Sequence, residues 1–311
     1  MKKILYLIWI VVAGLGGAAL RGMSLLQGYE ADTGLPVEGY LPAMALIGLT
    51  IAVAVTALLT GRLGFQSRSS WSFEQMYGNM PLLLRLVCML CGLGTAGICA
   101  WGIVSLPDQI AEQAAVYGDQ ILLPGRLIIT ATGAAWILGI LSGLCMLLLA
   151  QGQGSKPATR FTGLCCTLPI FWCCLDLIMV YHENSGNPVL SDYSYLLLMI
   201  IAVMAAFHSM GTYLYSASGS GTRWIAAAGI AVYLVFVNAG GTIFAAWQEG
   251  SAAVISDLLG TGNTLRVGAL ALTGLYLLIQ LGCTLGKKEE AYKKKQHFEQ
   301  DSECCFFMWK E

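Results

Sequence analysis

The sequence predicts an all-α, polytopic integral membrane protein with about eight transmembrane helices. Of its 311 residues, 57% are hydrophobic and 11% are charged, whereas soluble domains average about 45 to 50% apolar and about 25% charged residues. Eight apolar runs each approach the roughly 20 residues that a helix needs to cross a bilayer. These runs are continuous rather than alternating, which excludes a membrane β-barrel.

The eight runs follow one another with short connections that leave no room for a soluble domain. The first run follows Lys2 and Lys3 and ends in small residues, as a signal peptide does, but it is longer than the usual apolar region of about 7 to 15 residues. We therefore expect it to remain as a permanent helix. The predicted spans are residues 4–20, 41–60, 82–103, 126–150, 161–181, 193–214, 224–247 and 266–285.

The positions of lysine and arginine predict the orientation, because basic residues are retained on the cytoplasmic side of the membrane. With the N-terminus inside, fourteen of the 17 basic residues are cytoplasmic, and only Arg21, Arg126 and Arg266 are external. The even number of helices returns the C-terminus to the cytoplasm. The short connections and the absence of an N-x-S/T sequon indicate a bacterial cytoplasmic membrane.

Two internal matches predict a repeat. The segment Tyr29–Val37 recurs as Tyr181–Val189 with the same Tyr, Gly, Pro and Val, and Arg126 before the fourth run matches Arg266 before the eighth. They indicate two parallel four-helix repeats, residues 1–150 and 151–286, related by a pseudo-two-fold axis along the membrane normal. A charged cytoplasmic tail, residues 287–311, follows. The alternative is a Gly-Pro turn that occurs twice by chance.

Two further patterns concern the helices and their connections. Leu106–Gly125 has apolar residues at helical spacing, which predicts an interfacial helix, with a solvated loop as the alternative. Glu249–Asn263 is its shorter counterpart. Small residues four apart, which let helices approach closely, occur as Gly139 and Gly143 in the fourth run and as Gly282 and Gly286 in the eighth.

Polar residues within the spans are the candidate substrate-binding residues, because an unpaired polar group in hydrocarbon costs several kcal/mol. Asp176 lies in the outer third of the fifth run, and Asn238 of the seventh lies at a similar depth. Arg21, at the outer end of the first run, is within reach for an ion pair with Asp176. Such a pair either lines a path for a solute or fastens the two halves together.

Three other residues complete the candidate set. Arg126 and Arg266, at the outer starts of the fourth and eighth runs, suit a carboxylate or phosphate ligand beside helix N-termini. The alternative is that each pairs with an acidic loop residue such as Asp119 or Asp257. His208 is expected to make a structural hydrogen bond, because no acidic residue at its depth completes a proton relay.

Several function classes are disfavoured. The net charge of −1 gives no basic footprint for nucleic acid. The eleven cysteines lie in apolar runs or in the tail, so we expect neither a disulfide framework nor a metal site, because buried cysteine packs as a small hydrophobe. No phosphate-binding loop, H-E-x-x-H pair or Ser-His nucleophile is present, so we expect no catalysis and no cofactor.

The function that remains is transport or a non-transporting membrane role. A body with little mass outside the membrane suits a small-solute transporter or permease component with a path between the two repeats. The alternative is a sensor, an assembly factor or a partner subunit, with a protein partner or a second copy of the chain. The Lys287–Lys295 cluster is expected to attract anionic lipid.

Overall fold

The computed structural model of the chain is all-helical in the residues it describes, and eight of its helical segments are long and apolar enough to cross a membrane. The eight predicted spans are thereby confirmed, although several helices extend beyond the predicted ends. The described residues are 2–30, 35–64, 77, 80–109, 111, 124–152, 160–184, 193–215, 220–248 and 253–287.

The helices are numbered along the chain, and two short π-helical segments continue or interrupt them. The elements are α1 (Lys2–Gln27), α2 (Leu41–Leu59), η1 (Thr60–Gly64), α4 (Leu82–Val104), α6 (Pro124–Gly152), α7 (Arg160–Asn184), α8 (Ser194–Tyr215), α9 (Ser220–Val235), η4 (Phe236–Gly240), α10 (Gly241–Gln248) and α11 (Ala253–Gly286).

Proline and glycine residues account for the start of α2 and for one feature inside α7. α2 has a proline within its first two positions, where the missing N–H group has no intrahelical partner to lose. Gly39, two residues before α2, has a φ of 72°, a conformation that glycine adopts without steric cost. Pro169 lies inside α7, as membrane helices tolerate when neighbouring helices support the backbone.

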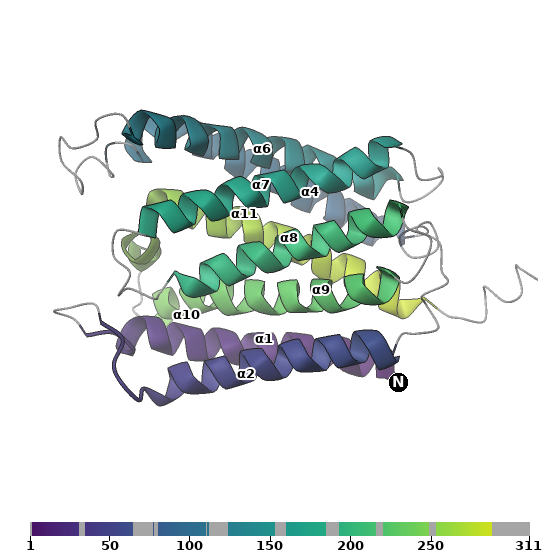
Figure 1. The fold of residues 1–311 in the computed structure, drawn as a ribbon, viewed down its shortest axis with the longest axis horizontal. Coiled ribbons are helices and arrows are strands. Elements are labelled where there is room, and N and C mark those ends of the chain that lie inside the picture. The colour runs from purple at the N-terminus through teal and green to yellow at the C-terminus, as the bar shows by residue number, and fades with distance from the viewer. Residues whose placement is uncertain are drawn as a thin grey trace, which may run out of the picture.

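Six helices pack in a closed ring. Successive contacts run from α4 to α6, α7, α8, α9 and α11, and α11 packs back against α4. The α1/α2 hairpin lies outside this ring, because α1 packs on α9, η4 and α10, and α2 packs on α1 and α9. Figure 1 shows this hairpin along one side of the bundle and α4 with α6 along the opposite side.

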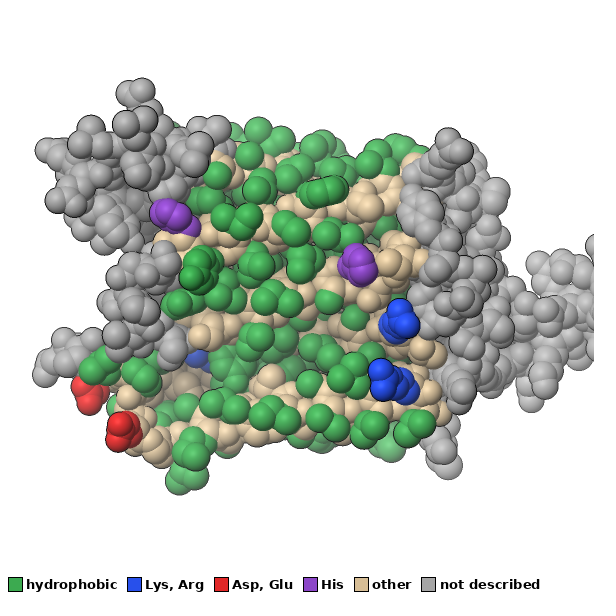
Figure 2. Space-filling view, viewed as in Figure 1, with side chains coloured by type: hydrophobic (Ala, Val, Ile, Leu, Met, Phe, Trp, Pro, Cys, Tyr) green, Lys and Arg blue, Asp and Glu red, His purple; other side chains and the backbone are tan. Residues whose placement is uncertain are grey.

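The two ends of the bundle differ in charge. One end, called the acidic end, carries exposed Glu30, Glu38 and Asp108, whereas the other, called the basic end, carries exposed Arg223 and the start of α4 with Arg85. In Figure 2, hydrophobic side chains cover the middle of the visible face between red side chains at one end and blue ones toward the other. An apolar belt between two polar ends is the surface that a bilayer requires.

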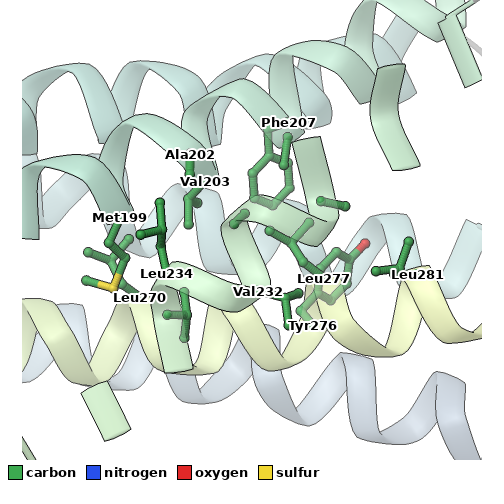
Figure 3. Close-up of a cluster of buried hydrophobic side chains, with 14 of the residues drawn as sticks. Met199, Ala202, Val203, Phe207, Val232, Leu234, Leu270, Tyr276, Leu277 and Leu281 are labelled. Carbon is green, nitrogen blue, oxygen red and sulfur yellow. The ribbon is translucent and has the colours of Figure 1, made fainter. Parts of the chain in front are cut away.

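Apolar side chains from α8, α9 and α11 fill the space between these three helices. Phe207 and Tyr276 stack with ring centroids 6.3 Å apart and planes at 15°. Figure 3 shows the cluster around them, with side chains from the three helices directed toward one another. The labelled members are Met199, Ala202, Val203, Phe207, Val232, Leu234, Leu270, Tyr276, Leu277 and Leu281.

The predicted two-repeat arrangement is not confirmed. A two-fold axis relating the first four spans to the last four requires α2 to pack on α4 as α8 packs on α9, yet α2 packs on α1 and α9. The matched segments also differ, because Tyr29 lies in an isolated β-bridge with Pro36, whereas Tyr181 lies within α7. Residues 185–189 of the second segment are outside the described part of the chain, as is the tail after Lys287.

The predictions for the connections before the fourth and eighth spans have different outcomes, one corrected and one largely untested. α11 begins at Ala253, so residues 253–263 belong to a continuous helix rather than to a separate interfacial one, and Arg266 lies well inside the helix rather than at its start. Of the predicted interfacial segment, Leu106 to Gln109 are helical after a turn at Ser105, and most of the rest lies outside the described residues.

The predicted glycine contacts are correct in the fourth span and wrong in the eighth. A Cβ atom on Gly143 would lie 2.5 Å from the carbonyl oxygen of Gly92 on α4, and one on Gly139 would lie 2.5 Å from Cys99 Sγ. A Cβ on Gly282 would meet only Leu7, at 3.8 Å, and one on Gly286 would meet nothing within 4 Å. Close backbone approach therefore occurs between α4 and α6 and not at the end of α11.

Candidate functional site

A buried ion pair lies inside the six-helix ring. Arg266 Nε on α11 donates a hydrogen bond of 3.0 Å to Asp176 Oδ1 on α7. Both side chains are only 2% exposed. Arg266 also donates from Nη1 to Asn263 Oδ1, one turn earlier on α11. We call Asp176, Arg266 and Asn263 the ion-pair centre.

The ion-pair centre links two helices that are not neighbours in the ring order. α7 packs on α6 and α8, whereas α11 packs on α4, α8 and α9. Asp176 lies eight residues before the end of α7 at Asn184, or about 12 Å at the helical rise per residue. The pair therefore lies toward the acidic end of the bundle, and it spans the ring interior at that level.

Two tryptophans lie on the helices that surround the ion-pair centre. Trp172 precedes Asp176 by one turn of α7 and is fully buried, and Trp136 on α6 is 1% exposed. A Cβ on Gly139 would lie 3.1 Å from Trp172 Nε1, and one on Gly102 would contact the Trp136 ring. Within the described part of the chain, neither indole nitrogen has a hydrogen-bond partner.

Two cysteines near the ion-pair centre provide natural reporters of its surroundings. Cys99 on α4 and Cys173 on α7 are both fully buried, and both lie close enough to Asp176 to interact electrostatically with it. The residues that sequence reasoning missed are Asn263, Trp136 and Trp172. The signal available for Trp172 was its i, i+4 spacing from Asp176, which places both residues on one face of a helix.

The expected ion pair between Asp176 and Arg21 is wrong. Asp176 pairs with Arg266 instead, and Arg21 lies with its Cζ 5.2 Å from the ring centroid of Tyr195 on α8. The physical reason is the position of the α1/α2 hairpin. α1 packs mainly on α9, η4 and α10, so the two residues that share a depth lie on helices that are not close neighbours.

The remaining predicted site residues lie apart from one another. Asn238 is 4% exposed within η4, and its Nδ2 approaches Met199 Sδ at 3.9 Å. His208 lies on the exposed side of α8. Arg126 lies in the first turn of α6, and its side chain is outside the described residues. Arg266 is bound to Asp176 and Asn263. An anion site shared by Arg266 and Arg126 remains a prediction, because the Arg126 side chain lies outside the described residues.

The ion-pair centre joins α7 to α11 through the attraction between two opposite charges. Opposite charges in a low-dielectric interior attract strongly, and each is costly to leave without a partner. Among the described residues, no group of three or more His, Cys, Asp or Glu side chains is arranged to hold a metal ion. The centre consists of two opposite charges and the side-chain amide of Asn263.

The comparisons with known proteins add no relative. No protein-family model matches the chain, and searches of curated proteins and of solved structures found no match.

Proposed function

We propose that the protein is a small-solute transporter or permease component whose solute contacts the ion-pair centre. The observation that carries this proposal is the buried Asp176–Arg266 pair inside the ring. Ionisable residues within membrane spans are costly to bury, and they commonly mark substrate or ion pathways. No catalytic role is part of the proposal.

The position of the ion-pair centre supports this role. It joins two helices that are not adjacent in the ring, so a solute that replaces one partner of the pair would also release the link between α7 and α11. A polar solute carrying a charge of its own suits such an exchange, because each protein charge keeps a counter-charge throughout. The binding of solute is thereby coupled to a movement of helices.

In this proposal, apolar packing closes the solute path on the basic side of the ion-pair centre. Tyr276 lies ten residues after Arg266 on α11, toward the basic end, and its ring stacks on that of Phe207. A transporter with this packing is closed on the basic side and opens by helix movement. The same apolar packing favours the second candidate, a non-transporting sensor, assembly factor or partner subunit.

Water access to the native cysteines distinguishes the two candidates. Cells or sealed vesicles carrying the whole chain are treated with a membrane-impermeant methanethiosulfonate reagent, and each cysteine is then quantified by mass spectrometry. Transport predicts modification of Cys99 or Cys173, beside the ion-pair centre. The matched control is Cys88, which is fully buried in the basic half of α4.

A different labelling result would contradict transport. A Glu38→Cys variant, altered at an exposed position of the acidic end, reports that the reagent reaches the protein. If that variant is modified while Cys99 and Cys173 react no faster than Cys88, the ion-pair centre is sealed from water. Transport through the ring is then excluded, and the non-transporting role is retained.

The charges at the two ends of the bundle lead to a proposal for its orientation in the membrane. We propose that the acidic end faces outward, that both termini are cytoplasmic and that the membrane is a bacterial cell membrane. The exposed basic side chain of Arg223 at the basic end supports this orientation, because basic residues are retained on the cytoplasmic side. Anionic lipid at the Lys287–Lys295 cluster, and a protein partner or second copy, complete the proposal.

A further inference from the structure

A second polar cluster lies between the α1/α2 hairpin and the ring, separate from the ion-pair centre. It consists of Arg21 and Ser24 on α1, Thr50 on α2, Tyr195 on α8 and Tyr233 on α9, and we call it the hairpin cluster. Figure 2 shows a blue side chain set back between its neighbours near the end of the bundle that carries the red carboxylates.

Arg21 is held in place from two sides. Its guanidinium lies over the Tyr195 ring at 5.2 Å, a cation–π arrangement that is strengthened when water is excluded. Its aliphatic stem lies against the start of α10, where a Cβ on Gly241 would come within 2.6 Å of Arg21 Cγ. The residue is only 5% exposed, so this cation is fixed in position within the protein.

For three hydroxyl groups of the hairpin cluster, the donor and the acceptor of each hydrogen bond can be identified. Thr50 Oγ1 donates to the carbonyl oxygen of Leu46 at 2.8 Å, so its single proton is used within α2. The contacts from Tyr233 at 2.9 Å and Tyr195 at 3.4 Å are therefore donated by the tyrosines to Thr50. Both tyrosine protons are directed inward, away from any ligand beside Arg21.

Ser24 is different, because its hydroxyl has no hydrogen-bond partner among the described residues although it is 3% exposed. It follows Arg21 by three positions on α1, so the two side chains share a helix face. A buried hydroxyl without a partner is destabilising, because its hydrogen bonds to water are lost and not replaced. A ligand that accepts a hydrogen bond from Ser24 beside the guanidinium removes this cost.

We infer that Arg21 and Ser24 form a binding site for a phosphate-type oxyanion. A phosphate group places negative charge beside the guanidinium and supplies an acceptor oxygen for the Ser24 hydroxyl. Arg21 lies six residues before the end of α1 at Gln27, about 9 Å along the helix from that end, so the site lies toward the acidic end of the bundle. The phosphate belongs either to an anionic lipid of that leaflet or to inorganic phosphate.

The experiment is a titration of thermal stability with the full-length chain in a neutral detergent. The probes are phosphatidylglycerol, phosphatidylcholine and inorganic phosphate. Stabilisation of the wild type by phosphatidylglycerol identifies a lipid source, and stabilisation by inorganic phosphate alone identifies a soluble source. Arg21→Gln is expected to raise the half-maximal concentration of the effective probe about tenfold or more, and Ser24→Ala about threefold, consistent with lost charge-assisted hydrogen bonds.

Arg223→Gln, at an exposed arginine of the basic end, is the matched control and is expected to behave as wild type at this site. If Arg21→Gln does not fold, Arg21→Lys replaces it, because Lys keeps the charge and loses the planar two-point geometry. The inference is overturned if no phosphate probe stabilises the wild type, or if the Arg21 and Ser24 variants respond as the wild type does. The ion-pair centre takes no part in this test, so its failure leaves the proposed transport role unaffected.

Discussion

At the residue scale, the stability of the ring depends on keeping Asp176 and Arg266 together. Each charge was transferred from water into a side-chain environment that is 2% exposed, which costs several kcal/mol per ion before the attraction between the two is counted. Asn263 satisfies a further donor of the guanidinium. The pair therefore contributes little net stability as a unit, while the loss of one partner leaves the other as a buried, uncompensated ion.

Asp176→Asn is expected to destabilise the protein by about 3 to 5 kcal/mol, because Arg266 loses its counter-charge inside the ring. The measurement is the unfolding free energy or the Tm of the full chain in detergent. The double variant Asp176→Leu with Arg266→Met is expected to recover most of the loss, since it removes both charges. Glu38→Gln, at an exposed carboxylate, is the control and should leave the Tm unchanged.

A wild-type Tm for Asp176→Asn would contradict the importance of this link. Equal losses for the single and double variants would show that the side-chain volume, rather than the charge, decides the stability at this place.

At the element scale, α4 and α6 approach each other closely enough for their backbones to touch. A Cβ on Gly92 would lie 2.7 Å from the carbonyl oxygen of Gly143, and one on Gly143 would lie 2.6 Å from the backbone nitrogen of Ala96. Backbone atoms cannot move aside as a flexible side chain can. In lipid, such close packing is a main source of helix association, because burial of apolar surface supplies little driving force there.

Gly143→Ala is expected to separate α4 from α6 and to destabilise the protein by about 1 to 3 kcal/mol, the range for overpacked sites. Gly97→Ala on α4 is the matched control, because a Cβ there would meet nothing within 4 Å. The two variants are compared by thermal unfolding in detergent. Equal Tm values for both would show that α4 and α6 are not held at the distance seen here.

At the scale of the whole molecule, charge is distributed unequally between the two ends. Glu30 and Glu38 lie at the end opposite Arg223. Basic residues near the spans resist translocation, whereas acidic residues have little influence on orientation. The basic end is therefore expected in the cytoplasm.

Single cysteines introduced by Glu38→Cys and Arg223→Cys test this orientation in intact cells with an impermeant thiol reagent. We expect the first variant to be modified in intact cells and the second only after permeabilisation. The native cysteines, which occur in both variants, serve as the common background. The reverse pattern would invert the orientation of all eight spans.

The sequence by itself determined the fold class, the number of spans and the presence of a charged residue, Asp176, within a span. It could do so because the exclusion of water from hydrocarbon imposes length and apolarity on every span, whatever its neighbours. The sequence could not show which helix faces are buried, because residues that face lipid are as apolar as residues that face the core.

Only the tertiary structure decided which helices are neighbours, and with them the partners of the charges. Asp176 pairs with Arg266 rather than Arg21 because α1 lies outside the ring on α9. The packing that sets these neighbours comes from shape, as at Gly92 and Gly143, and from sparse polar contacts such as Thr50 with Tyr233. Such contacts join residues far apart in the chain, and no local pattern in the sequence specifies them.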